Sequence, residues 1–579
     1  MEEKKEIKFN DLKEMLKISG EKYGERPAYY LEGTTLENSK IMTHAELRKN
    51  IDYLGTALIE MGLKNKKIAV ISENRYEWEV AYLAIVCGTG IVVPLDKALP
   101  NNEIESSIER SEVEAIFYSE KYGEIMASIQ KKGNTKVKYF ISMDAEKQDF
   151  NKFSQKEIIQ KGKELVENGN REFIDAKIDK DKMSIMLFTS GTTNMSKIVM
   201  LSHKNLCTNI NDISNCFDVC ENDRMLSFLP LHHTFECTVG FLYPISVGCA
   251  IVFSKGVRHF SEELKNYKIT ALISVPVMFE KIYQKLMKTL KEKGKLETVK
   301  KGAAIAGILN KVGIDVRKKL FKEIHEGLGG ELRLMVAGGA ALDPKIEKGF
   351  NDMGFNLAQG YGLTETSPVI SAEFMKKRKE GSIGKKMPSV EIKLDEMDEK
   401  GVGELLVKGD SVMLGYFNND EANKESFTDD GWFRTGDLAK IDSDGYIFIA
   451  GRKKFVIVLQ NGKNVYPEEI EALIDKLEFV KESMVYGMPA DDGDVTISVK
   501  VVYDKDYINE HCPNATEEEI HGIIWQKIKE INRTMPKYKY IKNLIITDQE
   551  MVKTTTLKIK RRVEMEKILK EKEKNVTIL

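Results

Sequence analysis

The sequence predicts an α/β protein: a large N-terminal body of parallel-sheet βαβ layers with a β-rich subdomain, followed by a small C-terminal α/β domain. Two observations predict this fold. Short β-branched runs alternate with helical stretches up to about residue 380, which is typical of βαβ units and parallel sheets. Beyond that point glycines become frequent and the runs between them are short and alternating, which indicates strands joined by tight turns.

The first clear helix should begin at Thr43, which forms the sequence pattern of a capping box with Glu46. Gly62 supplies its end. Its apolar residues recur every three or four positions, at Leu47, Ile51, Leu54 and Leu58. Eight β-branched or apolar runs are expected to be strands of the body: 68–71, 90–95, 115–118, 185–189, 226–229, 250–253, 271–275 and 332–336.

A lysine-rich stretch from about residue 280 to residue 330 is helical in pattern. We expect its charges to form a solvated helix face, and a membrane-surface or partner-binding role is the alternative. From Pro467 the βαβ pattern returns, and the chain ends in a strongly charged helix. We therefore expect an N-terminal domain over residues 1–451 and a C-terminal domain over residues 452–579.

Composition excludes several classes of protein. The 88 Lys and Arg residues nearly balance the 90 Asp and Glu residues, for a net charge of −2, and this balance supplies no broad basic surface for nucleic acid. No apolar stretch approaches the roughly 18 residues that span a bilayer. The first residues lack an apolar signal core, and seven cysteines without a C-x-x-C pair indicate reduced thiols. We expect a cytoplasmic enzyme or binding protein.

The first stretch whose residues could bind a ligand follows the apolar run 184–188. It is rich in Ser, Thr and Gly, so its hydroxyls and backbone N–H groups can surround a phosphate, with a lysine as point charge. It is not the usual P-loop pattern, and a plain loop is the alternative. Its candidate phosphate-binding residues are Thr189, Ser190, Gly191, Thr192, Thr193 and Lys197.

The second candidate site combines two segments of the chain, one of small residues and one with an aromatic and an acidic residue. Gly338, Gly339 and Ala340 permit close approach by a planar ligand. Further along the chain, Tyr361 can stack on a purine beside Gly362, and Thr364 can bind a phosphate. Glu365 is a hard oxygen ligand suited to Mg²⁺. The alternative is a turn with a buried tyrosine.

Three further stretches lie toward the C-terminus. Asp437, in a glycine-framed turn, can accept hydrogen bonds from two ribose hydroxyls, unless it only caps its own turn. Arg452 to Lys454 precede the apolar run FVIVL, which is followed by Asn461-Gly462, the sequence of a hairpin. Lys558 lies in a basic segment that alone indicates nothing specific.

Together and in this order, the five stretches resemble the adenylate-forming superfamily, which contains acyl-CoA synthetases, adenylation domains of nonribosomal peptide synthetases and beetle luciferases. The chain looks most like long-chain fatty acyl-CoA synthetases: a helical insert precedes VAGGAALDP, SENRYEW occurs early, and Leu557 precedes Lys558 where many shorter-chain relatives have glycine. The matching strings are FTSGTTNMSKIVMLSH, LPLHHTFE, QGYGLTETSP, GWFRTGDL, GRKK to NGKNVYPEEIE, and TLKIKRR.

The resemblance implies two half-reactions with ATP, Mg²⁺ and CoA. A fatty carboxylate attacks the α-phosphate of ATP and gives an acyl-adenylate and pyrophosphate. The CoA thiolate then displaces AMP and gives the thioester. Fatty acid, ATP and CoA are the implied partners, and a peripheral membrane contact is plausible because long-chain fatty acids partition into lipid. The sequence specifies neither acyl chain length nor oligomeric state.

The resemblance also implies a role for each candidate residue. Lys558 bridges the fatty carboxylate and the α-phosphate, and Thr364 and Glu365 act beside it, with Glu365 on Mg²⁺. His233 stands at the acyl pocket, unless it is a packed or capping histidine. Asp437 and Arg452 hold the ribose. The β- and γ-phosphates are held by Thr189 to Thr193 and Lys197, and adenine by Gly338, Gly339, Ala340, Tyr361 and Gly362.

A rotation of the C-terminal domain is implied as well. Lys454 matches the hinge position, and the hairpin around Gly462 then lines the pantetheine tunnel of CoA. The phosphate loop departs from the family pattern at Asn194, Ser196 and Ile198, where Gly, Pro and Gly are usual. Two other functions stay open: a ligase that uses acyl carrier protein as acceptor, and a catalytically inactive nucleotide- or lipid-binding protein.

Overall fold

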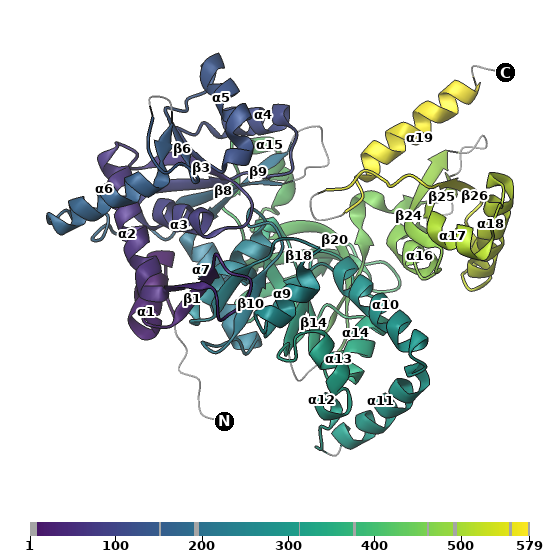
Figure 1. The fold of residues 1–579 in the computed structure, drawn as a ribbon. Coiled ribbons are helices and arrows are strands. Elements are labelled where there is room, and N and C mark those ends of the chain that lie inside the picture. The colour runs from purple at the N-terminus through teal and green to yellow at the C-terminus, as the bar shows by residue number, and fades with distance from the viewer. Residues whose placement is uncertain are drawn as a thin grey trace. The chain divides into compact units, whose positions relative to one another are not determined.

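The computed structural model describes residues 8–149, 152–189, 196–311, 313–374, 378–459, 463–489, 495–554 and 558–576 (Figure 1). The chain divides into two compact units. The first contains residues 1–391 and 407–431, and the second contains residues 392–406 and 432–579. The boundary predicted between residues 451 and 452 stays a prediction.

The predicted α/β fold is confirmed in the first unit, which contains two large sheets that are mostly parallel. In the nine-stranded sheet the six central strands, β1, β11, β10, β12, β13 and β14, pair in parallel. Strand β2 at one edge and strands β15 and β16 at the other pair antiparallel. Its order is β16 (Lys385–Lys386), β15 (Val369–Ala372), β14 (Leu357–Gly362), β13 (Leu334–Ala337), β12 (Ala271–Ser274), β10 (Arg224–Ser227), β11 (Ala250–Phe253), β1 (Pro27–Leu31) and β2 (Lys40–Thr43).

The eight-stranded sheet has the same character. Strands β3 to β8 pair in parallel, and β8, β9 and β19 form an antiparallel edge. Its order is β19 (Gly415–Tyr416), β9 (Lys197–Ser202), β8 (Met183–Thr189), β4 (Gly90–Pro94), β3 (Lys66–Ile71), β5 (Ala115–Tyr118), β6 (Tyr139–Ser142) and β7 (Phe153–Ser154). All eight runs predicted to be strands overlap strands of these two sheets.

The helices of the first unit cover these sheets. The predicted capping box is present: Thr43 caps α2 (His44–Glu60) together with Glu46. Gly162 lets two helices approach closely, because a Cβ there would lie 1.8 Å from the Tyr53 carbonyl oxygen. The other helices include α1 (Leu12–Tyr23), α3 (Tyr76–Ala84), α4 (Asn101–Ser111), α5 (Gly123–Lys132), α6 (Gln155–Glu167), α7 (His203–Cys216), α8 (Tyr243–Ser246), α9 (Phe260–Asn266), α14 (Pro344–Asp352) and α15 (Asp420–Ser426).

The lysine-rich stretch forms helices, as the sequence predicts. These are α10 (Pro276–Glu292), α11 (Leu296–Lys311), α12 (Arg317–Leu320) and α13 (Lys322–Gly327), which lie together at the lower edge of the first unit in Figure 1. Buried Phe321 and Ile324 join them to the core that Phe279 and Phe350 share. None of the helices in the described ranges is long and apolar enough to cross a membrane.

The predicted β-rich region forms the four-stranded sheet β17 (Val390–Asp395), β18 (Gly403–Gly409), β20 (Phe433–Ile441) and β21 (Ile447–Arg452). The C-terminal part contains the three-stranded sheet β24 (Val480–Pro489), β25 (Val495–Tyr503) and β26 (Asn543–Thr547). Its core is rich in isoleucine from α16 (Pro467–Ile474) and α18 (Glu517–Arg533). The hairpin predicted around Gly462 is framed by the paired strands β22 (Ile457–Val458) and β23 (Asn464–Val465). Two more helices are α17 (Lys505–His511) and α19 (Arg561–Val576).

Candidate active site

The predicted phosphate loop connects two antiparallel strands. Thr189 ends β8 and Lys197 begins β9, and the two residues are register partners. The Thr189 hydroxyl donates a hydrogen bond of 3.4 Å to the Lys197 carbonyl oxygen. The hairpin therefore holds the first and last residues of the loop together. The other predicted loop residues lie outside the described residues: Ser190, Gly191, Thr192 and Thr193.

Tyr416 connects this hairpin to the predicted magnesium ligand. It lies on β19, which pairs with β9, and the Lys197 ammonium lies 4.5 Å from the centre of its ring. The Tyr416 hydroxyl donates a hydrogen bond of 2.9 Å to Oε1 of Glu365. Burial and the Glu365 carboxylate both raise the pKa of Tyr416, so the phenol stays protonated and can donate. The sequence patterns do not single out Tyr416, and the short apolar run VMLGYF is the available signal for it.

Thr364 and Glu365 stand on a rigid turn between β14 and β15. Gly362 makes this turn possible, because a Cβ at that position would lie 1.9 Å from the Pro368 carbonyl oxygen. Thr366 is buried, and its hydroxyl donates a hydrogen bond of 2.6 Å to the same oxygen. The Glu365 carbonyl oxygen accepts a hydrogen bond of 2.8 Å from the Met413 N–H. These contacts hold the backbone of the turn in place. The side chains of Thr364 and Glu365 remain partly exposed.

The predicted adenine slot follows a neighbouring strand. Gly338, Gly339 and Ala340 come directly after β13, whose Ala337 is the parallel partner of Gln359 on β14. Tyr361 lies two residues farther along β14, so the structure brings the slot and the predicted stacking residue to the same edge of the sheet. This is the carboxyl edge of parallel strands, where open α/β sheets bind ligands.

Each glycine of the slot has its own geometric reason. A Cβ at Gly338 would lie 2.8 Å from the Phe235 ring, and Gly339 has φ +85°, a left-handed conformation. Phe235 belongs to the LPLHHTF stretch, so this contact also joins the predicted acyl-pocket motif to the adenine slot.

His233 lies between β10 and the π-helix Phe235–Leu242. It is partly exposed, and its ring centre lies 4.4 Å from that of His232. The side chain of the neighbouring His232 is 8% exposed, and its Nε2 lies 3.3 Å from Oδ1 of Asp96. Burial works to raise the pKa of Asp96, but the neighbouring His232 and a hydrogen bond from the Ala98 N–H hold it at about 2. Asp96 therefore keeps His232 in place beside His233.

A buried acid in the same stretch was also missed. Glu236 is fully buried and accepts a hydrogen bond of 2.6 Å from the Ser227 hydroxyl. Burial raises the pKa of Glu236 to about 8. Because the sequence gives no sign of which acidic residue will be buried, this environment became visible only in the fold.

The two predicted ribose ligands form an ion pair in the second unit. Asp437 on β20 and Arg452 on β21 are register partners, and Nε of Arg452 lies 2.7 Å from Oδ1 of Asp437. The Asp437 side chain is almost fully buried and that of Arg452 is about a third exposed. The guanidinium thus orients a carboxylate that accepts charge-assisted hydrogen bonds.

Lys454 is the second residue after β21 and lies in the short helix Lys453–Phe455. Its ammonium lies 4.8 Å from the centre of the Phe455 ring. The neighbouring Lys453 pairs with Glu396 at 2.7 Å and with Glu404 at 3.0 Å. Lys454 is exposed. Gly462, predicted for the CoA tunnel, lies outside the described residues.

Lys558 lies on a closed loop near the C-terminus. The Lys558 N–H donates a hydrogen bond of 3.1 Å to the Thr554 hydroxyl, and the Thr554 N–H donates one of 2.8 Å to the Lys558 carbonyl oxygen. Buried Glu564 anchors the base of the loop, because it accepts hydrogen bonds from the Val552 N–H at 3.1 Å and the Lys500 ammonium at 2.8 Å. The loop is thus fixed at its base, and Lys558 itself is exposed.

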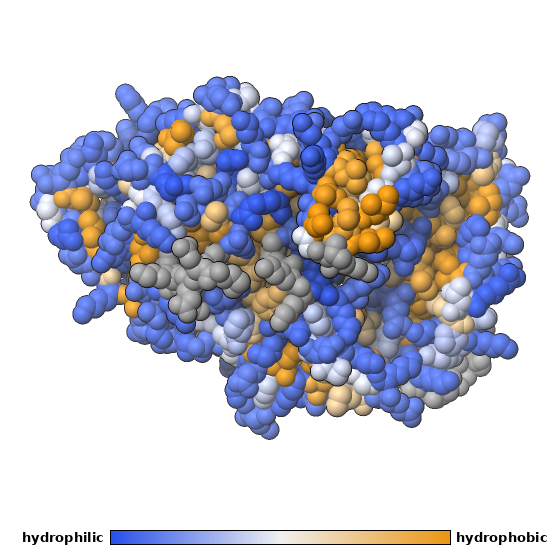
Figure 2. All heavy atoms as spheres, turned by 90° about the horizontal axis from the view of Figure 1, so that it is seen from below, coloured by the Kyte–Doolittle hydropathy of each residue, from blue (hydrophilic) through white to orange (hydrophobic). Residues whose placement is uncertain are grey.

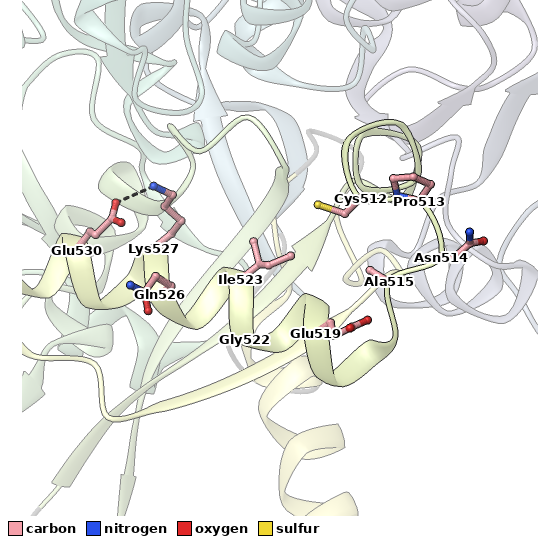
Figure 3. Close-up of a pocket in the computed structure, with 10 residues that line it drawn as sticks. All are labelled: Cys512, Pro513, Asn514, Ala515, Glu519, Gly522, Ile523, Gln526, Lys527 and Glu530. Atoms are coloured by element: carbon pink, nitrogen blue, oxygen red, sulfur yellow. Dashed lines mark hydrogen bonds and ion pairs between the residues drawn. The ribbon is translucent and has the colours of Figure 1, made fainter.

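A separate surface hollow lies in the C-terminal part, between α18 and the turn that precedes it (Figure 3). Cys512 and Pro513 line one side, and Gly522 and Gln526 of α18 line the other. No predicted site residue within the described ranges contributes to it, so it takes no part in the candidate site.

Comparison with known proteins agrees with these motifs. Residues 16–417 match the AMP-binding enzyme family, and residues 454–574 match the C-terminal domain of AMP-binding enzymes. The chain belongs to the AMP-binding enzyme family. Within the described residues of this AMP-binding enzyme, no group of three or more His, Cys, Asp and Glu residues could hold a metal ion.

Three relatives of this AMP-binding enzyme bear on the substrate. Fatty acyl-CoA synthetase B of Dictyostelium discoideum is 28% identical over 94% of this chain and 87% of its own. A long-chain-fatty-acid–CoA ligase of Mycobacterium tuberculosis is 26% identical over 91% and 90%. A chloroplastic long-chain-fatty-acid–[acyl-carrier-protein] ligase of Arabidopsis thaliana is 25% identical over 88% and 78%.

The solved structures agree on the fold. ATP-bound MatB from Rhodopseudomonas palustris superposes with a TM-score of 0.73, covers 96% of this chain and 99% of its own, and is 24% identical. At this identity the likeness concerns the fold of the AMP-binding enzyme and not its substrate.

Proposed function

We propose that the protein activates a long-chain fatty acid with ATP and transfers the acyl group to CoA, giving acyl-CoA, AMP and pyrophosphate. The observation that carries the proposal is the connection of Lys197 to Glu365 through Tyr416. This connection supports a single site in which Lys197 binds a phosphate and Glu365 binds the magnesium ion. The fatty acyl substrate is inferred from the relatives.

In the first half-reaction, a carboxylate oxygen of the fatty acid attacks the α-phosphorus, and pyrophosphate leaves. Positioning and neutralisation of charge are the main needs of such a reaction. Lys197, Thr189 and the loop between them hold the β- and γ-phosphates. Thr364 binds a phosphate oxygen, and Glu365 holds Mg²⁺, which neutralises phosphate charge when bound. Lys558 bridges the carboxylate and the α-phosphate.

The nucleoside is held by the remaining residues of the proposed site. Tyr361 stacks on adenine against Gly338, Gly339 and Ala340, and Gly362 permits the turn that follows. Asp437 accepts hydrogen bonds from the ribose hydroxyls, and Arg452 orients it. His233 stands at the fatty carboxylate.

In the second half-reaction, the CoA thiolate attacks the acyl carbonyl, and AMP leaves. We propose that residues 452–579 rotate between the two steps about Lys454. Gly462 then lines the path of the pantetheine chain, while Lys558 has moved away. We further propose a peripheral contact of the protein with the membrane, because long-chain fatty acids partition into lipid.

A ligase that transfers the acyl group to acyl carrier protein is the second candidate, because one relative of similar identity has that activity. Pyrophosphate release and thioester formation are measured with a C16 fatty acid, Mg-ATP and either CoA or acyl carrier protein. Thioester on CoA supports the proposal, and thioester on the carrier protein alone overturns the acceptor. Absence of pyrophosphate release with every fatty acid tested would favour an inactive binding protein.

A further inference from the structure

The segment from Lys281 to Lys322 has an unusual composition for this protein. It carries twelve lysines and one arginine against three acidic residues, a net charge of +10 in a chain whose total is −2. Several of these lysines make no ion pair with any residue that the structure describes, so their charge is available to a partner. They include Lys288, Lys293, Lys301, Lys318 and Lys319.

Large apolar side chains are exposed within the same segment. Ile305 is 59% exposed, Ile308 67%, Ile314 54% and Leu320 51%. Ile305 and Ile308 are three residues apart on α11, so they lie on one face of the helix. In Figure 2, which views the molecule from below, the region of α11 and α12 faces the reader and shows an orange patch bordered by blue residues.

Helix α11 is apolar on its inner face as well. Leu296, Val299 and Ala303 pack against the core of the first unit, and Ala306 is fully buried. The helix therefore does not need its outer isoleucines for folding. A surface helix normally presents polar residues to water, and an exposed apolar patch with a polar rim marks an interaction site.

We propose that this surface, formed by α10, α11 and α12, docks the protein on an anionic lipid bilayer. Ile305, Ile308, Ile314 and Leu320 enter the interface between headgroups and acyl chains, and the surrounding lysines contact lipid phosphates. Apolar insertion combined with a polybasic patch is the pair of signals that stable peripheral binding requires. The inference rests on the peripheral lipid contact proposed above and assigns it a surface.

The composition favours lipid over a protein partner. Protein interfaces are depleted in lysine and enriched in aromatic residues and arginine. Residues 296–322 contain no Trp or Tyr, and their one Phe, Phe321, is buried. Lysine side chains with apolar stems and mobile charges suit a fluid, phosphate-bearing surface better.

The test is flotation of the purified full chain with lipid vesicles, in the absence of ATP and CoA. Vesicles of phosphatidylcholine alone are compared with vesicles that contain phosphatidylcholine and phosphatidylglycerol at two to one. The variants are Ile305→Glu with Ile308→Glu, and Lys301→Gln with Lys318→Gln and Lys319→Gln. The controls are Val257→Glu, at a position that is 64% exposed, and Lys131→Gln with Lys161→Gln, which are exposed lysines of α5 and α6, and effects are compared per residue changed.

The wild-type protein and both controls should float with the anionic vesicles and much less with the neutral ones. The lysine variant should lose about fivefold in partitioning per charge removed, and the isoleucine variant should lose about tenfold or more per residue. All variants should keep the wild-type melting temperature and pyrophosphate release with water-soluble octanoate. An inactive protein that still floats would refute the proposed function and leave the docking surface standing.

Three results would overturn the docking surface. The first is failure of the wild-type protein to bind anionic vesicles. The second is equal binding by the isoleucine variant and Val257→Glu. The third is a wild-type dimer in light scattering that Ile305→Glu with Ile308→Glu dissociates without a change in flotation, because that would make the patch a contact between two copies of the chain.

Discussion

The Tyr416 hydroxyl donates a hydrogen bond of 2.9 Å to the Glu365 carboxylate, and the Tyr416 ring lies beneath the Lys197 ammonium at 4.5 Å. One buried phenol thus positions a cationic and an anionic side chain that are 168 residues apart in the sequence. Neither contact requires Tyr416 to gain or lose a proton. Tyr416 therefore acts by holding Lys197 and Glu365 in place.

Tyr416→Phe should impair turnover while leaving the fold intact. The ring under Lys197 is retained, but Glu365 loses a hydrogen bond to a charged acceptor, a loss of about 1.5–3 kcal/mol. We expect a drop of roughly tenfold or more in kcat/KM for Mg-ATP, with a higher requirement for Mg²⁺. Steady-state kinetics at varied Mg²⁺ measures both.

Tyr139→Phe is the matched control for this change, because the Tyr139 hydroxyl donates a hydrogen bond of 2.9 Å to the Met61 carbonyl oxygen away from the candidate site. Equal kinetics of the Tyr416 and Tyr139 variants would remove Tyr416 from the site.

Asp437→Ala should weaken ATP binding more than fatty-acid binding. The carboxylate is buried and paired with Arg452 at 2.7 Å, and its loss removes charge-assisted hydrogen bonds worth on the order of 1.5–3 kcal/mol. Apparent KM values for ATP and for a C16 fatty acid are measured separately on the folded variant. An unchanged ATP value would reject the ribose assignment.

Sequence reasoning predicted the elements that depend on local pattern. The capping box at Thr43 and the strand at 115–118 appear as expected, because periodicity and capping chemistry act within a few residues. Tyr416 escaped prediction because its role depends on the pairing of β19 with β9, two strands more than 200 residues apart. His232 and His233 are identical as letters, and the sequence does not show that Nε2 of His232 lies 3.3 Å from Oδ1 of Asp96.

The stability of the protein should decrease as pH rises because Glu236 titrates, and Glu236→Gln should remove that dependence. Burial raises the pKa of Glu236 from about 4.5 to about 8, so the unfolded chain releases a proton that the folded chain keeps. Stability is therefore lost as pH rises from about 4.5 to about 8, and the loss is complete above that range. Glutamine cannot ionise and accepts the same hydrogen bond from Ser227.

Thermal melting at pH 6 and pH 9 measures the effect. The wild-type protein and the control Glu109→Gln, on the exposed face of α4, should lose more stability between the two pH values than Glu236→Gln. An equal loss in all three proteins would show that Glu236 does not titrate in this range.

Lys558→Ala and Lys454→Pro should separate the two half-reactions. Lys558→Ala should slow adenylate formation by two or more orders of magnitude, roughly the loss of one preorganised charge in a transition state, yet synthetic acyl-adenylate should still react with CoA. Lys454→Pro fixes the backbone at the hinge, so adenylate should form while thioester transfer stalls. Rapid-quench assays of each half-reaction measure both variants.

Lys560→Ala is the matched control, since it is an exposed lysine of the same basic segment. Similar, mild losses in Lys558→Ala and Lys560→Ala would remove Lys558 from the reaction and leave it as one charge among several.

The nucleotide product of ATP is the most direct test of the adenylation chemistry. The purified protein is incubated with Mg-ATP, CoA and a C12–C18 fatty acid, and the nucleotides are separated by anion-exchange chromatography. Attack on the α-phosphate predicts AMP and pyrophosphate in equal amounts to the acyl-CoA formed, with ADP absent. ADP and inorganic phosphate in stoichiometric amounts would mean attack on the γ-phosphate and would contradict the account.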